Sequence, residues 1–491
     1  MDNRFYFGFN TSEERKKRRK AELYSMSEQV STFFWDEAPQ HGLEMREGQQ
    51  DMSFEIVDAL INDQHFAIEA GVGIGKSFGY LVPVLLYSKR MNKPVIIATS
   101  TIALQEQLWR DVHAVMPLLG LNRDVILAKG QTHYLCNKRA DEYMCDPKAD
   151  PPDALKEGIQ QGYEERKDFP EVLPQGVWDK VNVQRFSMKN CGSCEKKCKY
   201  YKVRAALKFT DGVVLCNQDF LTQHLMKLRR GQEGLINAAA DLLVVDEAHN
   251  LDDKVRSATT ERFGQGMLFG MIKSAFYELR SFDQSSVSGE KREAESAIIA
   301  FYNCLKAQVQ KQINEAEQDM RYADRFFFDN NGSAIELLTE MNAAIHNLSS
   351  SIQIYSSMDF RNNRSFAASD DLDAVSESLS ELLDRIDDML IWIEQHGSNT
   401  ELVYCPKNTK EIVSRLYFNG DERTILTSAT LTNATSGSLE EQYSYFISNT
   451  GFPAGDRGCL SEPKPSPYPY DEHAMIYYCD DLPHPTREHE A

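Results

Sequence analysis

The chain has 491 residues, of which 42% are hydrophobic and 26% are charged. One hydrophobic core seldom serves so long a chain, so we expect two or more compact units of roughly 100–200 residues each. The formal net charge of −20 excludes a protein that coats nucleic acid through bulk electrostatics, because that mode of binding requires an excess of Lys and Arg. Local basic patches remain compatible with this charge.

The apolar segments are too short to cross a membrane. The most apolar one, Tyr80–Tyr87, is far shorter than the roughly 18 apolar residues that a spanning helix needs, and Pro83 interrupts it. The basic run Arg15–Lys20 has no apolar stretch behind it, so we expect no signal peptide, no membrane partner and a cytoplasmic location. In such a protein the ten cysteines indicate free thiols or metal ligands rather than disulfides.

Short β-prone runs alternate with amphipathic, helix-like stretches, a pattern typical of a parallel α/β sheet. Most of these runs show no polar alternation, which suits strands that are buried on both faces. The runs are Phe66–Ile68, Val95–Thr99, Val125–Ala128, Gly212–Cys216, Leu242–Val245, Leu402–Tyr404 and Thr424–Leu426. We expect a single sheet assembled from these distant segments.

Two long stretches do not fit this sheet, and we interpret them as insertions between its strands. The first, 134–205, contains closely spaced cysteines. The second, 262–398, has apolar residues at steps of three and four, most clearly from Leu372 to Ile393, which predicts helices. A two-chain coiled coil is the alternative, although the heptads are not sustained over many turns.

The segment Ala70–Ser77 lies between a predicted strand and a predicted helix, the order found at phosphate-binding loops. Lys76 would reach the β and γ phosphates, and the Ser77 hydroxyl would hold Mg²⁺. Ala70 stands where the general pattern has glycine and costs only some freedom at the first turn. Backbone amides can turn towards phosphates at the remaining glycines, which are Gly71, Gly73 and Gly75. A Gly-Lys-Ser tripeptide in an ordinary loop is the alternative.

A pair of acids completes this site. The run Leu242–Val245 delivers Asp246 and Glu247 at its carboxyl end, where parallel sheets bind their ligands. Asp246 would position Mg²⁺ through a water, and Glu247 would orient and deprotonate the attacking water. The two segments therefore predict a site that binds and hydrolyses a nucleoside triphosphate, with a common surface turn as the alternative for the acids.

These segments belong to a longer series of motifs. Arg46-Glu47-Gly48-Gln49-Gln50-Asp51-Met52 precedes the phosphate loop, Asp246-Glu247-Ala248-His249 holds the acid pair, and Thr427-Ser428-Ala429-Thr430-Leu431 follows the last run. Thr99-Ser100-Thr101 is followed by Leu104, Gln105, Gln107 and Leu108. In this series the chain resembles the superfamily 2 helicases, and more narrowly the DinG and XPD-like iron–sulfur helicases.

The resemblance implies an α/β fold with a RecA-like P-loop NTPase sheet, an iron–sulfur insertion and a helical, Arch-like insertion. It implies that ATP is the nucleotide and that Gln49 reads its adenine. Ala70 is then normal for the loop, Val72 replaces the usual threonine, and His249 closes a DEAH box at the nucleotide site. The segment Thr99–Leu108 would grip the DNA backbone, and Thr427–Leu431 would couple hydrolysis to strand movement.

The cysteines extend the resemblance. The run Lys129-Gly130-Gln131-Thr132-His133-Tyr134-Leu135-Cys136 resembles the family's K-G-R-x-N-Y-L-C, whose cysteine is the first cluster ligand. The implied ligands of a [4Fe–4S] cluster are Cys136, Cys191, Cys194 and Cys198. Zinc stays open, because four cysteines also bind zinc and their spacing alone does not choose between the metals. Cys145 could replace one ligand.

Single-stranded or forked DNA is the implied partner. Between Lys189 and Arg230 there are ten Lys or Arg residues against three acids, with Tyr200, Tyr201 and Phe209 interleaved. Basic and aromatic residues together are typical of surfaces that bind single strands. A solvated helix face that covers the cluster is the alternative.

The resemblance gives an expected division of the chain. It runs from an N-terminal segment and the first part of RecA-like domain 1 (1–133), through the iron–sulfur insertion (134–205), the continuation of domain 1 with the DEAH box (206–261) and the helical insertion (262–398), to the end of domain 1 (399–460) and the start of a second RecA-like domain (461–491). The family's arginine-bearing Q-x-x-G-R-x-x-R motif does not occur in the 491 residues. We therefore expect another chain or further sequence to supply the second domain, and little turnover by this chain alone.

Three functional hypotheses follow. The leading one is an ATP-dependent DNA helicase of 5′ to 3′ polarity that acts in DNA repair. The second is a catalytically silent iron–sulfur module that binds single-stranded DNA. The third, an unrelated P-loop kinase or transporter ATPase, predicts neither the cysteine group nor the motif Thr427–Leu431.

Overall fold

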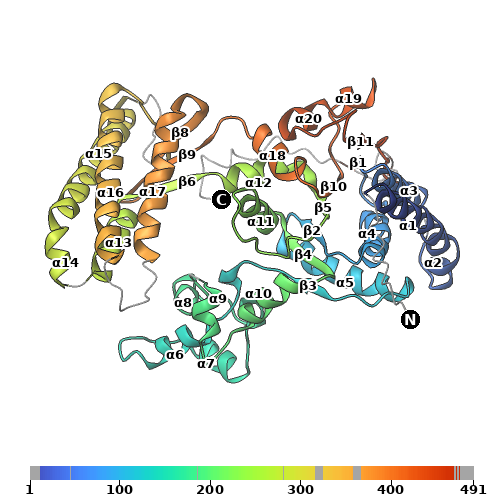
Figure 1. The fold of residues 1–491 in the computed structure, drawn as a ribbon, viewed down its shortest axis with the longest axis horizontal. Coiled ribbons are helices and arrows are strands. Elements are labelled where there is room, and N and C mark those ends of the chain that lie inside the picture. The colour runs from blue at the N-terminus through green and yellow to red at the C-terminus, as the bar shows by residue number, and fades with distance from the viewer. Residues whose placement is uncertain are drawn as a thin grey trace, which may run out of the picture. The chain divides into compact units, whose positions relative to one another are not determined.

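The structure is a computed structural model that describes residues 12–44, 46–184, 186–279, 281–315, 324–357, 367–468, 472 and 475. The chain divides into two compact units (Figure 1). Unit 1 comprises Met1–Asp252 and Lys410–Ala491, and unit 2 comprises Asp253–Thr409.

A seven-stranded parallel sheet lies at the centre of unit 1. Its strands, in the order β11-β1-β10-β5-β2-β4-β3, come from distant parts of the sequence. They are β1 His65–Glu69, β2 Val95–Thr99, β3 Val125–Leu127, β4 Val213–Asn217, β5 Leu242–Asp246, β10 Arg423–Ser428 and β11 Gly458–Leu460. The sheet confirms the predicted α/β class and is consistent with a RecA-like helicase fold.

Helices cover both faces of the sheet, which explains the lack of polar alternation in its strands. Val95 and Ile97 of β2 join the hydrophobic core of one face, whereas Ile96 between them points to the other face, beside α11. All three side chains are buried. The helices that build the first core are α1 Ser12–Thr32, α3 Glu47–Ile61, α4 Lys76–Met91 and α5 Ile102–Leu118. The second group contains α11 Gln218–Arg229, α18 Lys410–Tyr417, α19 Leu439–Gln442 and α20 Ser444–Thr450.

The cysteine-containing region of unit 1 consists of short helices around its own small core. Trp178 lies at the centre of this core, is 1% exposed, and packs edge-on against Phe169. The helices are α6 Asn137–Cys145, α7 Asp153–Gln160, α8 Gln175–Val181, α9 Met188–Gly192 and α10 Lys199–Phe209.

Unit 2 contains helices and a four-stranded antiparallel sheet of order β6-β9-β8-β7. Its long helices pack on one another through a core that the sheet shares. The elements are α12 Leu251–Ala258, which begins in unit 1, β6 Glu261–Gly264, α13 Gln265–Glu278, α14 Ser281–Ser286, α15 Ser288–Glu315, β7 Arg325–Phe327, α16 Gly332–Ser357, α17 Ala367–Asp384, β8 Met389–His396 and β9 Asn399–Pro406.

Two details of the sequence interpretation were wrong here. Leu402–Tyr404 belongs to β9 of this second sheet and not to the parallel sheet. The helical pattern assigned as far as Ile393 ends at Asp384, because the following residues pair with β9 as strand β8. The turn between the strands uses Gly397 at φ 61°, a conformation that favours glycine.

One expected segment can be compared with the structure only in part. Within the expected start of a second RecA-like domain (461–491), the described residues are 461–468, 472 and 475. In the part of the chain that is described, no helix combines the length and the apolar character that crossing a membrane requires.

Candidate nucleotide site

The phosphate loop connects the carboxyl end of β1 to the first residue of α4. Gly73 and Gly75 adopt left-handed conformations with φ of 89° and 88°. A side chain at Gly75 would also overlap the amide of Gln49. Lys76 and Ser77 lie in the first turn of α4, where the free backbone amides and the helix dipole favour an anion. The local structure therefore has the form that phosphate binding needs.

The N-terminal end of α3 lies against the carbonyl groups of this loop. Arg46 donates a hydrogen bond to the carbonyl of Gly73, and Gln49 Nε2 donates one to the carbonyl of Gly75 at 2.9 Å. Gln49 is 7% exposed and also borders a cavity of about 200 Å³. The other residues around this cavity are Phe33, Ala38, Leu43, Glu44, Arg46 and Phe78. The sequence motifs did not reveal the apolar members. Phe33, Ala38 and Leu43 come from a π-helix at Phe33–Glu37 and the residues after it, and Phe78 comes from α4.

The acid pair lies at the carboxyl end of β5, facing the start of α4. Lys76 Nζ forms an ion pair with Glu247 Oε1 at 3.0 Å, and both side chains are largely buried. The hydroxyl of Tyr80, one turn further along α4, donates to Asp246 Oδ2 at 3.0 Å. The structure thus brings the predicted lysine into contact with Glu247. Both predicted acids contact side chains of α4.

Burial controls the electrostatics of Asp246. It raises the pKa of this carboxyl to about 6, Lys76 opposes the shift, and Glu247 adds to it. A bound cation would offset the cost of holding two adjacent carboxylates in a buried place. Carboxylate and hydroxyl oxygens are ligands that Mg²⁺ prefers, so Asp246 and Ser77 fit the expected metal.

The backbone at the acid pair is held in an unusual conformation. Glu247 has φ 57°, a left-handed conformation that is uncommon for a residue with a side chain. Gln218 Nε2 donates to the carbonyls of Asp246 and Glu247, at 2.7 and 3.1 Å. Gln218 belongs to no motif in the sequence, so its contribution to the site was missed.

The motif Thr427–Leu431 lies directly beside the acids. The Ser428 hydroxyl donates to Glu247 Oε2 at 3.2 Å and lies 2.6 Å from His249 Nδ1. Glu69, at the end of β1, accepts hydrogen bonds from the backbone amides of Leu431 and Thr432, each at 2.6 Å. These contacts join the ends of β1, β5 and β10 in a single polar site, and Glu69 is a second residue that sequence reasoning did not assign a role.

The expected DNA-gripping segment is only partly accessible. Thr101 caps α5 by accepting a hydrogen bond from the amide of Leu104. The residue Leu104 is 37% exposed. Gln105 is fully buried and donates to the carbonyls of Ala128 and Leu215. Gln105 therefore supports the sheet and does not offer its amide to a ligand.

The four predicted cluster ligands lie in one region. Burial raises the pKa of the Cys198 thiol, and neighbouring Cys136 and Cys191 raise it further. Cys194 Sγ instead lies 3.6 Å from the carbonyl of Lys196, and Cys145 is exposed at the end of α6. In the described ranges no group of three or more His, Cys, Asp or Glu side chains is arranged to hold a metal ion. Three of the thiols are thus neighbours, but they do not form a closed ligand set.

The basic and aromatic run after the cysteines is largely committed to internal contacts. Tyr200 is 5% exposed and packs on Tyr134, and Lys199 pairs with Glu165 at 2.7 Å. Phe209, in contrast, is 83% exposed. A single strand could therefore stack on Phe209 but not on Tyr200.

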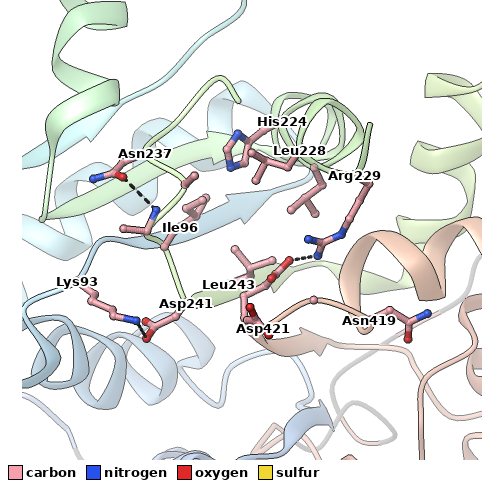
Figure 2. Close-up of a pocket in the computed structure, with 16 residues that line it drawn as sticks. Lys93, Ile96, His224, Leu228, Arg229, Asn237, Asp241, Leu243, Asn419 and Asp421 are labelled. Carbon is pink, nitrogen blue, oxygen red and sulfur yellow. Dashed lines mark hydrogen bonds and ion pairs between the residues drawn. The ribbon is translucent and has the colours of Figure 1, made fainter. Parts of the chain in front are cut away.

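A second cavity lies at the opposite end of the sheet. This space has a volume of about 550 Å³ and lies between α11 and the amino ends of β2 and β5. Figure 2 shows the residues that line it. Lys93 pairs with Asp241 across its edge at 2.6 Å, and Arg229 pairs with Glu422. Ligands of parallel sheets bind at the carboxyl ends of the strands, so this cavity is not the nucleotide site.

A phosphate loop after β1 and an acid pair after β5, joined through Lys76, define a P-loop NTPase with a RecA-like sheet. Comparison with known proteins narrows this class. Residues 131–266 match the DEAD_2 family model.

Similar proteins cover most of the chain. It is 24% identical over 479 residues to the Bacillus subtilis (strain 168) protein "Probable ATP-dependent helicase YpvA", which covers 91% of this chain and 69% of that protein. It is 26% identical over 496 residues to "3'-5' exonuclease DinG" of the same organism, a match that covers 89% of this chain and 50% of that protein. It is 30% identical over 240 residues to "ATP-dependent DNA helicase YoaA" of Escherichia coli (strain K12), a match that covers 46% of this chain and 36% of that protein. The chain thus spans about half the length of some of these relatives. Together the matches support the classification of the chain as DinG-like, and as a helicase or ATPase.

Proposed function

We propose that this chain binds Mg·ATP at the phosphate loop and forms the ATP-binding half of a DNA helicase. The ion pair between Lys76 and Glu247 carries the proposal, because it joins the anion-binding end of α4 to the acids of β5. Two of the relatives described above, YpvA and YoaA, are named as ATP-dependent helicases and support it.

The geometry suggests how the residues act. Lys76 and Glu247 neutralise each other at 3.0 Å. A triphosphate would offer Lys76 a competing anion, which would release Glu247 to orient the attacking water and accept its proton. Mg²⁺ held by Ser77 and Asp246 would neutralise charge on the phosphates. Ser428, which donates to Glu247, would sense whether Glu247 has been released.

Single-stranded or forked DNA is the proposed second substrate, with 5′ to 3′ polarity. The polarity rests on the family resemblance alone. Duplexes with a single-stranded tail at either the 5′ or the 3′ end, added with ATP to the chain together with the sequence that supplies its second RecA-like domain, test it: unwinding of only the 3′-tailed duplex would contradict the proposed direction. We also propose a cytoplasmic location, which cell fractionation checks.

We further propose that Cys136, Cys191, Cys194 and Cys198 hold a [4Fe–4S] cluster. The proximity of three of these thiols supports this, and four thiolates are a sufficient ligand set. Anaerobically purified protein should contain iron and acid-labile sulfide and absorb near 400 nm, and Cys198→Ser should lose them. The exposed Cys145 gives the matched control, Cys145→Ser, which should keep the cluster. Stoichiometric zinc without sulfide would contradict the cluster.

Nucleotide binding is the primary test of the function. Lys76→Ala should abolish binding of a fluorescent Mg·ATP analogue, whereas Lys89→Ala, an exposed lysine at the other end of α4, should not change it. Equal binding by both variants would contradict the proposed site. DNA-stimulated hydrolysis is then measured with the same proteins, and intact DNA binding with no hydrolysis would favour the silent binding module.

A further inference from the structure

The segment that follows β11 runs along the outside of the phosphate loop. Its backbone continues the parallel pairing with β1. The amide of Ser461 donates to the carbonyl of Ala67 at 3.0 Å, and the amide of Lys464 donates to the carbonyl of Glu69 at 2.9 Å. The carbonyl of Lys464 then accepts from the amide of Gly71 at 2.9 Å. We call residues 461–468 the strap.

A charged anchor fixes the strap before it reaches the tip of the loop. Lys464 Nζ lies 2.8 Å from Glu55 and 3.6 Å from Asp51, both on α3. Arg46 and Gln49, which donate to carbonyls of the loop, lie at the N-terminal end of the same helix. The strap and the loop are therefore both anchored to α3.

The end of the strap contacts the tip of the loop directly. The Ser466 hydroxyl donates to the carbonyl of Val72 at 2.7 Å and accepts from the amide of Tyr468 at 3.2 Å. The ring of Tyr468 covers Gly73 so closely that a side chain at this position would overlap it. The guanidinium carbon of Arg46 lies 6.0 Å from the centre of the same ring.

These contacts determine which way the loop amides point. Ser466, Arg46 and Gln49 hold three loop carbonyls, those of Val72, Gly73 and Gly75. In a trans peptide the carbonyl of one residue and the N–H of the next point in opposite directions, and the described chain has no cis peptides. The amides that follow these carbonyls, those of Gly73, Ile74 and Lys76, are therefore turned away from the donors. The Ile74 amide donates within the loop to the carbonyl of Gly71 at 3.4 Å, so the amides of Gly73 and Lys76 are the candidates for binding phosphate. Amides of this part of a phosphate loop are the ones that bind phosphate.

We propose that Ser466 and Tyr468 are positioning residues for the phosphates of the nucleotide. They hold the carbonyl side of the loop so that its amides form the phosphate-binding surface before the nucleotide arrives. The inference rests on the proposed Mg·ATP site and adds to it two residues that lie almost four hundred positions away in the sequence. Loss of the Ser466 hydroxyl should weaken ADP binding roughly 3- to 10-fold, the ordinary net effect of one hydrogen bond.

The test compares affinities for a fluorescent Mg·ADP analogue and the matching AMP analogue in the whole chain. Ser466→Ala and Tyr468→Ala should each weaken ADP binding more than AMP binding, because the strap acts through the amides that meet the outer phosphates. Ser466→Thr should restore the affinity. The matched control is Ser448→Ala, which removes a hydroxyl-to-carbonyl bond of 2.8 Å on α20. Thermal unfolding without nucleotide should be the same for all four variants.

The outcomes separate the inference from the function on which it rests. Unchanged ADP affinity in Ser466→Ala and Tyr468→Ala, with no binding by Lys76→Ala, would overturn the strap and leave the nucleotide site intact. An equal loss of ADP and AMP affinity would also overturn it, because the effect would not involve the phosphates. Binding that Lys76→Ala does not reduce would remove the proposed function, and the strap with it.

Discussion

Acid should destabilise unit 1 through buried histidines, most clearly through His65 at the base of the sheet. His65 Nδ1 accepts from the amide of Thr424 at 3.0 Å, and its Nε2 lies 3.1 Å from the carbonyl of Phe418, so the neutral ring joins β1 to β10. Burial, together with the charges of Arg423 and Arg457, lowers the pKa of His65 to about 4. His224, which is buried beside the second cavity, also has its pKa lowered to about 4 by burial.

The sign follows from comparing the folded and unfolded states. An unfolded histidine has a pKa of about 6.5, so the unfolded chain takes up the proton first. The stabilisation is complete above about pH 6.5 and is lost as the pH falls towards the folded pKa of about 4. For one such histidine the loss in unfolding free energy between pH 8 and pH 5 is about 2 kcal/mol.

Urea unfolding at pH 8 and pH 5 measures this loss. His65→Gln should show a loss about 2 kcal/mol smaller than the unmodified chain, because it no longer takes up the proton. Comparing the two proteins cancels the titration of every other group. The exposed His113 supplies the control, and His113→Gln should match the unmodified chain. An equal loss in His65→Gln and the unmodified chain would refute the reasoning.

Three further predictions concern the rest of the molecule. Glu165→Gln should lower the unfolding free energy by about 2 kcal/mol, because Glu165 pairs at 3.0 Å with Lys129, which is almost fully buried. Urea unfolding checks this, with Glu171→Gln at an exposed position as the control. Gly73→Ala should weaken ADP binding strongly, because φ of 89° is strained for alanine and its side chain would overlap the ring of Tyr468; fluorescence titration checks it. Ile345→Ala should lower the unfolding free energy of unit 2 by about 2–5 kcal/mol and leave nucleotide affinity unchanged, and an altered affinity would contradict the assignment of the site to unit 1.

The sequence predicted the parallel sheet because its strands are continuous apolar runs with few polar interruptions. β2, Val95–Thr99, was predicted with the bounds that it has in the structure. The predicted phosphate loop and acid pair meet because both follow parallel strands, whose carboxyl ends share one edge of the sheet.

Long-range pairing accounts for what the sequence could not predict. The apolar residues of β8 fit a helical step as well as a strand, and only pairing with β9 distinguishes the two. Three residues act on the site through hydrogen bonds to backbone groups: Gln218, Glu69 and Ser466. Every residue type has the same backbone groups, so such a bond leaves no pattern in the sequence of the segment that it contacts. The arrangement of the cysteines is also a matter of tertiary structure, and the spacing of the thiols does not reveal that Cys194 turns towards Lys196.

A crystal structure of the chain with Mg·ADP tests the central claim most directly. The account predicts the β-phosphate within hydrogen-bonding distance of the amides from Gly73 to Ser77, with Lys76 Nζ moved from Glu247 to the phosphate. Nucleotide bound elsewhere, or bound at the loop with the Lys76–Glu247 ion pair still at 3.0 Å, would contradict it.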